Sequence, residues 1–210
     1  RTEHDGSLTV MMDNWQGKPL NSPNDVIVKS DGSIWFTDPV FGILGNYEGH
    51  KADSEIPQAV YRIDGDSGEA TIVSTDALGP NGLCFSPDEK ILYLVDSRGE
   101  PNRKILAYDV ADNGRELGNQ RIHIDAGPGG TPDGMRCDID GNLWCGWGMG
   151  SADLDGVLVF APDGTKIGRI ALPERCANVC FGGPKRNRLF MASSQSLYSL
   201  YVNTQGVAGG

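Results

Sequence analysis

Hydrophobic residues alternate with polar ones in short runs along this chain, and glycine, proline and aspartate separate the runs. Two such runs around a Gly/Asp/Pro turn are the pattern of a β-hairpin. No segment keeps apolar residues at positions i, i+3, i+4 and i+7 over three turns, so no α-helix is predicted. The pattern therefore predicts an all-β protein.

One hairpin pattern of about 17 to 19 residues occurs four times, which makes it an internal repeat. In each copy a polar residue, then proline or alanine, then asparagine or aspartate precede the first apolar run. The copies occupy residues 22–38, 79–97, 131–148 and 176–194. Further strand pairs are predicted between and after the copies, beginning at Ala59, Lys104, Gly156 and Ser196, and the opening segment 5–14 has the same alternation.

Four strands per repeat, at a period of about 50 residues, are typical of a β-propeller blade. A β-sandwich would not repeat its sequence so regularly. We therefore predict a single β-propeller domain over residues 1–210, which begins inside a blade and is incomplete at its N-terminal side.

Asn24, Asn81 and Asp133 occupy the same position in three of the repeats. The innermost strands of a propeller line its central channel, so equivalent residues at the starts of these strands converge at one mouth. Two amide oxygens and a carboxylate are hard ligands that suit calcium or magnesium better than zinc or copper. The alternative is that each residue starts a turn or caps a strand. Asn178, in the fourth repeat, precedes a valine and is either a further channel-facing residue or a turn residue.

The 28 acidic residues outnumber the 18 basic ones, for a formal net charge of −10. Such a chain repels phosphate backbones and anionic headgroups, so we expect no nucleic acid and no membrane as partner, and a small substrate that is not strongly anionic.

The five cysteines form no Cys-x-x-Cys pair and are expected to be small buried residues of a reducing compartment. This favours a cytoplasmic protein, or a periplasmic one if a signal peptide precedes the chain.

At these same residues the sequence resembles the gluconolactonase and regucalcin family of six-bladed, metal-dependent lactonases. The resemblance spans essentially the whole chain and is most specific over residues 17–39, which are similar to the bacterial gluconolactonases. Residues 79–88 and 131–144 support it independently. It implies a six-bladed propeller of which this chain supplies about four blades, with the N-terminal blades missing.

Members of that family bind one divalent cation, often calcium, through a glutamate, two asparagines and an aspartate. The resemblance implies that Asn24, Asn81 and Asp133 are metal ligands here, with calcium as the expected ion and zinc, manganese or magnesium as alternatives. The family's glutamate has no counterpart in this chain. Ser22 lies where animal regucalcins carry an arginine thought to touch the sugar substrate.

The expected function is the hydrolysis of a small sugar lactone such as gluconolactone. The cation would polarise the lactone carbonyl, and Asp133 would be the catalytic residue that accepts a proton from the attacking water. Two alternatives stay open: a phosphotriesterase-type hydrolase on the same metal centre, and a calcium-binding propeller without catalysis. The oligomeric state is not indicated. Weaker candidates for substrate contact are Asn21, Asp38, Glu55 and Trp147.

Overall fold

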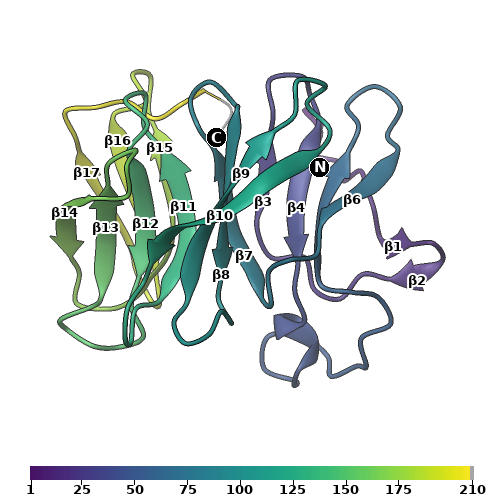
Figure 1. Ribbon diagram of the computed structural model, residues 1–210, viewed down its shortest axis with the longest axis horizontal. Helices are drawn as coiled ribbons and strands as arrows, with labels where there is room; N and C mark the ends of the chain where they lie inside the picture. Colours follow the sequence, from purple (N-terminus) through teal and green to yellow (C-terminus); the bar gives the residue numbers. More distant parts are fainter. Residues whose placement is uncertain (209–210) are drawn as a thin grey trace.

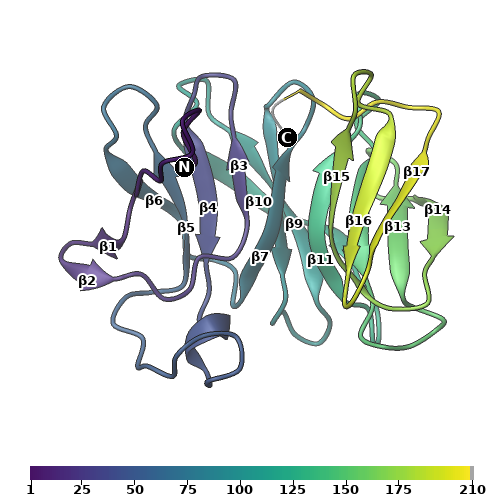
Figure 2. The same cartoon turned by 180° about the vertical axis from the view of Figure 1, so that it is seen from behind.

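Four antiparallel β-sheets stand side by side in the computed structural model, which describes residues 1–208 (Figures 1 and 2). Three sheets have four strands and one has three, and neighbours in each sheet are consecutive in sequence. This is the up-and-down order of a propeller blade, and the prediction of an all-β propeller is confirmed. The described residues contain one helical element, the 3₁₀ turn η1 (Phe41–Ile43), and no helix that is long and apolar enough to cross a membrane.

The first two strands of every blade form the hairpin predicted from the repeat. The first blade consists of β3 (Val26–Val28), β4 (Ile34–Asp38), β5 (Ala59–Ile63) and β6 (Ala70–Ser74). The second consists of β7 (Pro80–Phe85), β8 (Ile91–Asp96), β9 (Lys104–Val110) and β10 (Leu117–Asp125). The third consists of β11 (Pro132–Cys137), β12 (Leu143–Trp147), β13 (Gly156–Phe160) and β14 (Lys166–Ala171). The fourth consists of β15 (Cys176–Gly182), β16 (Arg188–Ser193) and β17 (Leu197–Tyr201).

The turns inside these hairpins explain why aspartate and glycine recur in the repeat. In the third blade, Oδ1 of Asp138 accepts the main-chain N–H of Asn142 at 2.9 Å. Gly141 in this turn and Gly32 in the first blade share a φ of 82°, which residues with a Cβ rarely adopt. The acidic segment 138–142 is therefore a hairpin turn, as its place in the repeat predicts.

The hydrophobic core lies between neighbouring blades. Trp35 of the first blade is fully buried and meets Phe85 of the second blade edge-on, with ring centroids 5.3 Å apart. Val95 of the second blade shares a buried cluster with Met135 and Leu143 of the third. Neighbouring blades therefore bury the apolar sides that face each other. All five cysteines are free thiols, and four are buried: Cys84, Cys137, Cys145 and Cys176.

Two predicted strand pairs are absent from the described residues. The opening segment 5–14 makes one isolated bridge, through Leu8, whose side chain is 79% exposed. It leads into a short ribbon of two-residue strands, β1 (Asn14–Trp15) and β2 (Lys18–Pro19). The segment from Ser196 supplies β17 alone, followed by a single bridge from Gly206. Alternation decides which side chains face a core, but a strand pair also needs partners for its backbone groups.

Candidate functional site

Asn81 and Asp133 are the second residues of the inner strands β7 and β11. In both strands the regular pairing with the next strand is interrupted there, over residues 80–83 and 132–135. A bulge of this kind re-aims the side chains of the residues within it. The same local irregularity therefore presents an amide in one blade and a carboxylate in the next.

The glycine after each of these residues allows the inner strands to approach one another. A Cβ on Gly82 would lie 2.3 Å from the main-chain oxygen of Asp133. A Cβ on Gly134 would lie 2.2 Å from Cγ of Asn178. Neither distance is compatible with a side chain, so the Pro-Asn-Gly and Pro-Asp-Gly motifs combine a bulge with a close contact between strands.

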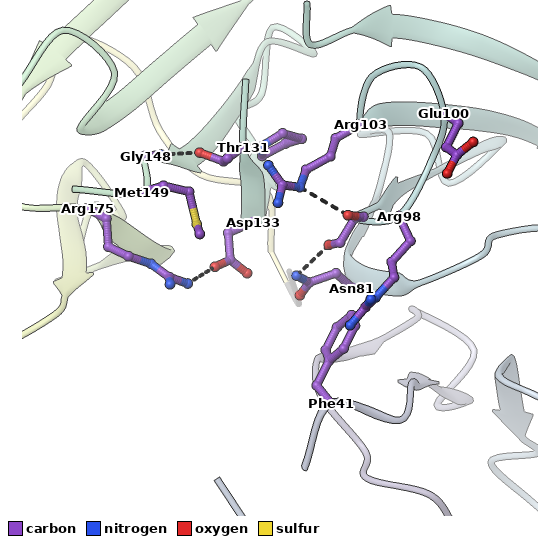
Figure 3. Close-up of a pocket in the computed structure, with 12 residues that line it drawn as sticks. Phe41, Asn81, Arg98, Glu100, Arg103, Thr131, Asp133, Gly148, Met149 and Arg175 are labelled. Atoms are coloured by element: carbon purple, nitrogen blue, oxygen red, sulfur yellow. Dashed lines mark hydrogen bonds and ion pairs between the residues drawn. The ribbon is translucent and has the colours of Figure 1, made fainter. Parts of the chain in front are cut away.

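Asn24, Asn81 and Asp133 line one cleft of about 430 Å³. An adjoining cavity of about 480 Å³, drawn in Figure 3, shares Asn81 and Asp133 with it. Cavities of this size hold small molecules. The structure thus brings the three predicted ligands together at one end of the inner strands, and their chemical roles stay predictions.

Asn81 is oriented by the second blade and keeps its carbonyl oxygen free. Its Nδ2 donates a hydrogen bond of 2.9 Å to the hydroxyl of Ser97, which directly follows β8. Its Oδ1 is buried and has no hydrogen-bond partner among the described residues. A buried acceptor without a partner costs free energy unless a ligand satisfies it, so this oxygen is a candidate ligand for a cation.

Asp133 is mostly buried and paired with an arginine. Nη2 of Arg175, just before β15, lies 2.8 Å from Oδ2 of Asp133. Burial raises the pKa of the Asp133 carboxyl, and Arg175 and Asn81 offset part of this rise by favouring the charged form. The charge of the buried Asp25 nearby raises the pKa of Asp133 further. This carboxylate is therefore more basic than an exposed aspartate.

The chemistry of the three side chains fits a hard divalent cation. Among residues 1–208, no group of three or more His, Cys, Asp and Glu side chains could hold a metal ion. Asn81 supplies a partnerless oxygen, Asn24 an exposed amide, and Asp133 a carboxylate in the same cleft. Calcium accepts such oxygen sets readily.

Sequence reasoning missed the arginines of the cleft. Arg98, Arg103 and Arg175 all line the adjoining cavity, and Arg98 and Arg175 line the cleft as well. They lie in connections between strands and share no repeat position. Phe41 of η1 lines the cavity as well. A weak signal was present, because Arg98 and Arg175 directly flank the second and fourth repeats.

Asn21 and Asp38 hold the chain just before β3. The Asp38 carboxylate accepts the main-chain N–H groups of Asn21 at 2.9 Å and Ser22 at 2.7 Å. Asp96 accepts that of Gly79 at 3.0 Å in the second blade, so this is a structural position of the repeat. Burial raises the pKa of the Asp38 carboxyl, and these hydrogen bonds oppose the rise. Neither Asn21 nor Asp38 is among the residues that line the cleft.

Glu55 and Trp147 lie apart from the cleft as well. Glu55 is exposed in the connection between β4 and β5, and its main-chain oxygen accepts Nζ of Lys18 at 3.2 Å. Trp147 ends β12, is 2% exposed, and packs beside Phe160 in the core. Substrate contact by the four weaker candidates therefore stays a prediction to which the geometry adds no support.

Residues 2–195 match the family described as the SMP-30/Gluconolactonase/LRE-like region, and the chain belongs to this family. A gluconolactonase of Zymomonas mobilis is 33% identical over 207 residues, which cover 94% of this chain and 55% of the relative. The structure of a gluconolactonase from Xanthomonas campestris is similar with a TM-score of 0.84 at 36% identity, covering 95% of this chain and 63% of that one.

A calcium-binding protein, regucalcin, from Agrobacterium tumefaciens is similar in fold, with a TM-score of 0.69 at 24% identity. That similarity covers 88% of this chain and 62% of the regucalcin chain. The chain spans about half the length of the curated relatives that it matches. The resemblance seen in the repeat motifs is thus confirmed at the level of the family.

Proposed function

We propose that the protein to which this chain belongs hydrolyses a sugar lactone of the gluconolactone type. The observation that carries the proposal is the convergence of Asn24, Asn81 and Asp133 on one cleft, in a chain of the gluconolactonase family. The names of the relatives from Z. mobilis and X. campestris support a lactone as substrate. A lactone is an internal ester, so the enzyme would be a carboxylic ester hydrolase.

The same three residues would hold one divalent cation, with calcium expected first and zinc, manganese or magnesium as alternatives. When bound, the cation would supply Lewis-acid polarisation of the lactone carbonyl. Asn81 would use its buried Oδ1, which has no partner among the described residues. Asn24 and Asp133 would add an amide oxygen and the one carboxylate of the set.

Asp133 would take the proton from the attacking water, because it is the one carboxylate among the three residues that converge on the cleft. The water oxygen then forms the new bond to the carbonyl carbon, and the bond from this carbon to the ring oxygen breaks. The proton held on Asp133 passes to the departing ring oxygen, which leaves an open-chain hydroxy acid. Arg175, 2.8 Å from the carboxylate, would fix its orientation.

The test is the initial rate of D-glucono-1,5-lactone hydrolysis by the intact protein, corrected for spontaneous ring opening. A chelator should abolish the activity, and calcium or one of the alternative cations should restore it. Undiminished hydrolysis by the metal-free protein would rule out the cation mechanism. Hydrolysis of a phosphotriester instead of the lactone would identify the phosphotriesterase alternative, and calcium binding without either activity would identify a binding propeller.

A further inference from the structure

Three arginine side chains line the cavity beside Asp133, in a chain whose net charge is −10 (Figure 3). Arg175 is paired with Asp133. Arg98 and Arg103 form no ion pair with any carboxylate in the part of the chain that the structure describes. Two positive charges of the cavity wall are therefore not neutralised by the protein.

Arg98 is held in place by packing. Its stem lies directly on Gly79, where an added Cβ would come within 2.6 Å of Cγ of Arg98. Its guanidinium carbon lies 5.7 Å from the centre of the Phe41 ring. The main-chain N–H of Arg98 donates a 3.1 Å hydrogen bond to Asp96. Arg98 is exposed, and no described residue accepts a hydrogen bond from its guanidinium, so these N–H groups are available to a ligand.

Arg103 is held by main-chain oxygens. Its Nε donates to the carbonyl of Ser97 at 3.0 Å, and its Nη1 donates to the carbonyl of Gly130 at 3.4 Å. These bonds connect the second blade to the loop before the third, and they orient the planar guanidinium without cancelling its charge. Because the Arg103 side chain is already fixed in the free protein, little side-chain conformational entropy is lost when a ligand binds to it. The binding free energy of the ligand is therefore more favourable.

The acidic residues near Arg98 and Arg103 form no ion pair with them. Glu100 lines the same cavity, and Glu48 lines the adjoining cleft, but both side chains are exposed and neither forms an ion pair with Arg98 or Arg103. Charges of the distant surface are screened over about 8 to 10 Å at physiological salt. The groups in the cavity, and not the net charge of the chain, therefore decide which ligand is accepted.

We propose that the cavity recognises a lactone that carries a second, anionic group, and that Arg98 and Arg103 bind this group while the lactone ring lies near Asp133. The guanidinium fork matches the paired oxygens of a carboxylate, sulfonate or phosphate. This assignment rests on the proposed lactonase function and narrows its substrate class. It replaces the expectation, drawn from net charge, of a substrate that is not strongly anionic.

The first test compares two lactones that differ only at C6. D-Glucaro-1,4-lactone carries a carboxylate where D-glucono-1,4-lactone carries a hydroxymethyl group. With the intact, cation-loaded protein, kcat/KM for the acidic lactone should exceed that for the neutral one by about tenfold or more. This is the factor that one charge-assisted hydrogen bond usually contributes. The 6-phosphate of D-gluconolactone serves as a third substrate, which distinguishes a phosphate site from a carboxylate site.

Arg98→Gln should bring the ratio of the two kcat/KM values close to one, mainly through a higher KM for the acidic lactone. Arg98→Lys, which keeps the charge but loses the planar fork, should retain part of the preference. Arg115→Gln is the matched control, because it removes the same charge from a side chain that is 64% exposed and outside the cavity. It should leave the ratio unchanged.

A second test measures binding without catalysis. Calorimetry in chelator should show the anionic D-glucaro-1,4-lactone binding more tightly than the uncharged D-glucono-1,4-lactone, with the difference lost in Arg98→Gln and reduced at high salt. Equal binding of the two lactones, together with a substrate ratio of one or less that Arg98→Gln does not change, would overturn the proposal and leave the lactonase function standing. If no lactone is hydrolysed, the proposed function is wrong. The calorimetry alone then tests whether Arg98 and Arg103 bind an anionic group.

Discussion

The inner strands of the second and third blades begin in one way, and the inner strand of the fourth begins in another. The strand pairing is irregular at the start of all three strands, but only Asn81 and Asp133 are followed by glycine and line the cleft. Asn178 has the same repeat position but is followed by valine, and its Oδ1 accepts the N–H of its neighbour Val179 at 2.8 Å.

The side chain of Asn178 occupies the space that a Cβ on Gly134 would need. It therefore packs against the third blade and is not among the residues that line the cleft. Asn178 is a residue of β15 that pairs with Ala192, so the prediction of a turn residue is wrong. The shared repeat position therefore places the backbone alike in these blades, and the contacts that each side chain makes decide whether it lines the cleft.

The largest effect, on stability, is expected where β7 and β11 lie in close contact, at Gly82 and Asp133. Gly82→Ala would press a Cβ against the main-chain oxygen of Asp133, which neither strand can move easily. It should lower the free energy of unfolding by about 3 kcal/mol or more, measured by urea denaturation. Gly118→Ala in β10 is the control, because no atom lies within 4 Å of its added Cβ. Equal stability of the two variants would show that the contact is not tight.

The next effect concerns catalysis at Asp133. Asp133→Asn keeps an oxygen ligand but removes the proposed base, so turnover at saturating cation should fall by about 10² or more. Calcium affinity should weaken only moderately. The measurement is the corrected rate of gluconolactone hydrolysis, with metal occupancy determined on the same samples.

Asn81→Asp is the control for this change, since it alters charge at the proposed cation site and leaves the base intact. It should retain more turnover than Asp133→Asn. A fully occupied Asp133→Asn enzyme with wild-type turnover would show that Asp133 serves only as a ligand.

A smaller effect, on calcium affinity, is expected when the amide of Asn81 in the second blade is removed. Asn81→Ala removes a ligand oxygen and should weaken calcium binding by about tenfold, measured by calorimetry. Ser97→Ala, which removes only the acceptor that orients Asn81, should weaken binding less. Unchanged affinity in Asn81→Ala would contradict the assignment of its buried oxygen to the cation.

The smallest effect is expected at Asn178. Asn178→Ala loses one local hydrogen bond and some packing, so stability should fall by about 1 kcal/mol. Calcium affinity should stay unchanged, in contrast to Asn81→Ala. A loss of affinity equal to that of Asn81→Ala would place Asn178 in the cation site and remove the distinction between the blades.

Several features were predictable from the sequence because they depend on neighbours along the chain. The alternation and the turn glycines Gly32 and Gly141 define the hairpins, and the repeat period defines the blades. The shared positions of Asn24, Asn81 and Asp133 follow from the repeat, since equivalent strands of a propeller start at the same height. Their presence in one cleft was therefore foreseeable.

Contacts between blades decided the rest. The pairing of Arg175 with Asp133 joins residues 42 positions apart, and Arg98 lies on Gly79 and beside the Phe41 ring, which are also distant in sequence. The opening segment 5–14 alternates as a strand does, yet apart from Asn14 in β1 it makes only an isolated bridge through Leu8. Alternation is a property of one segment, whereas charge pairing, strand pairing and close packing belong to two, and only the folded chain brings those two together.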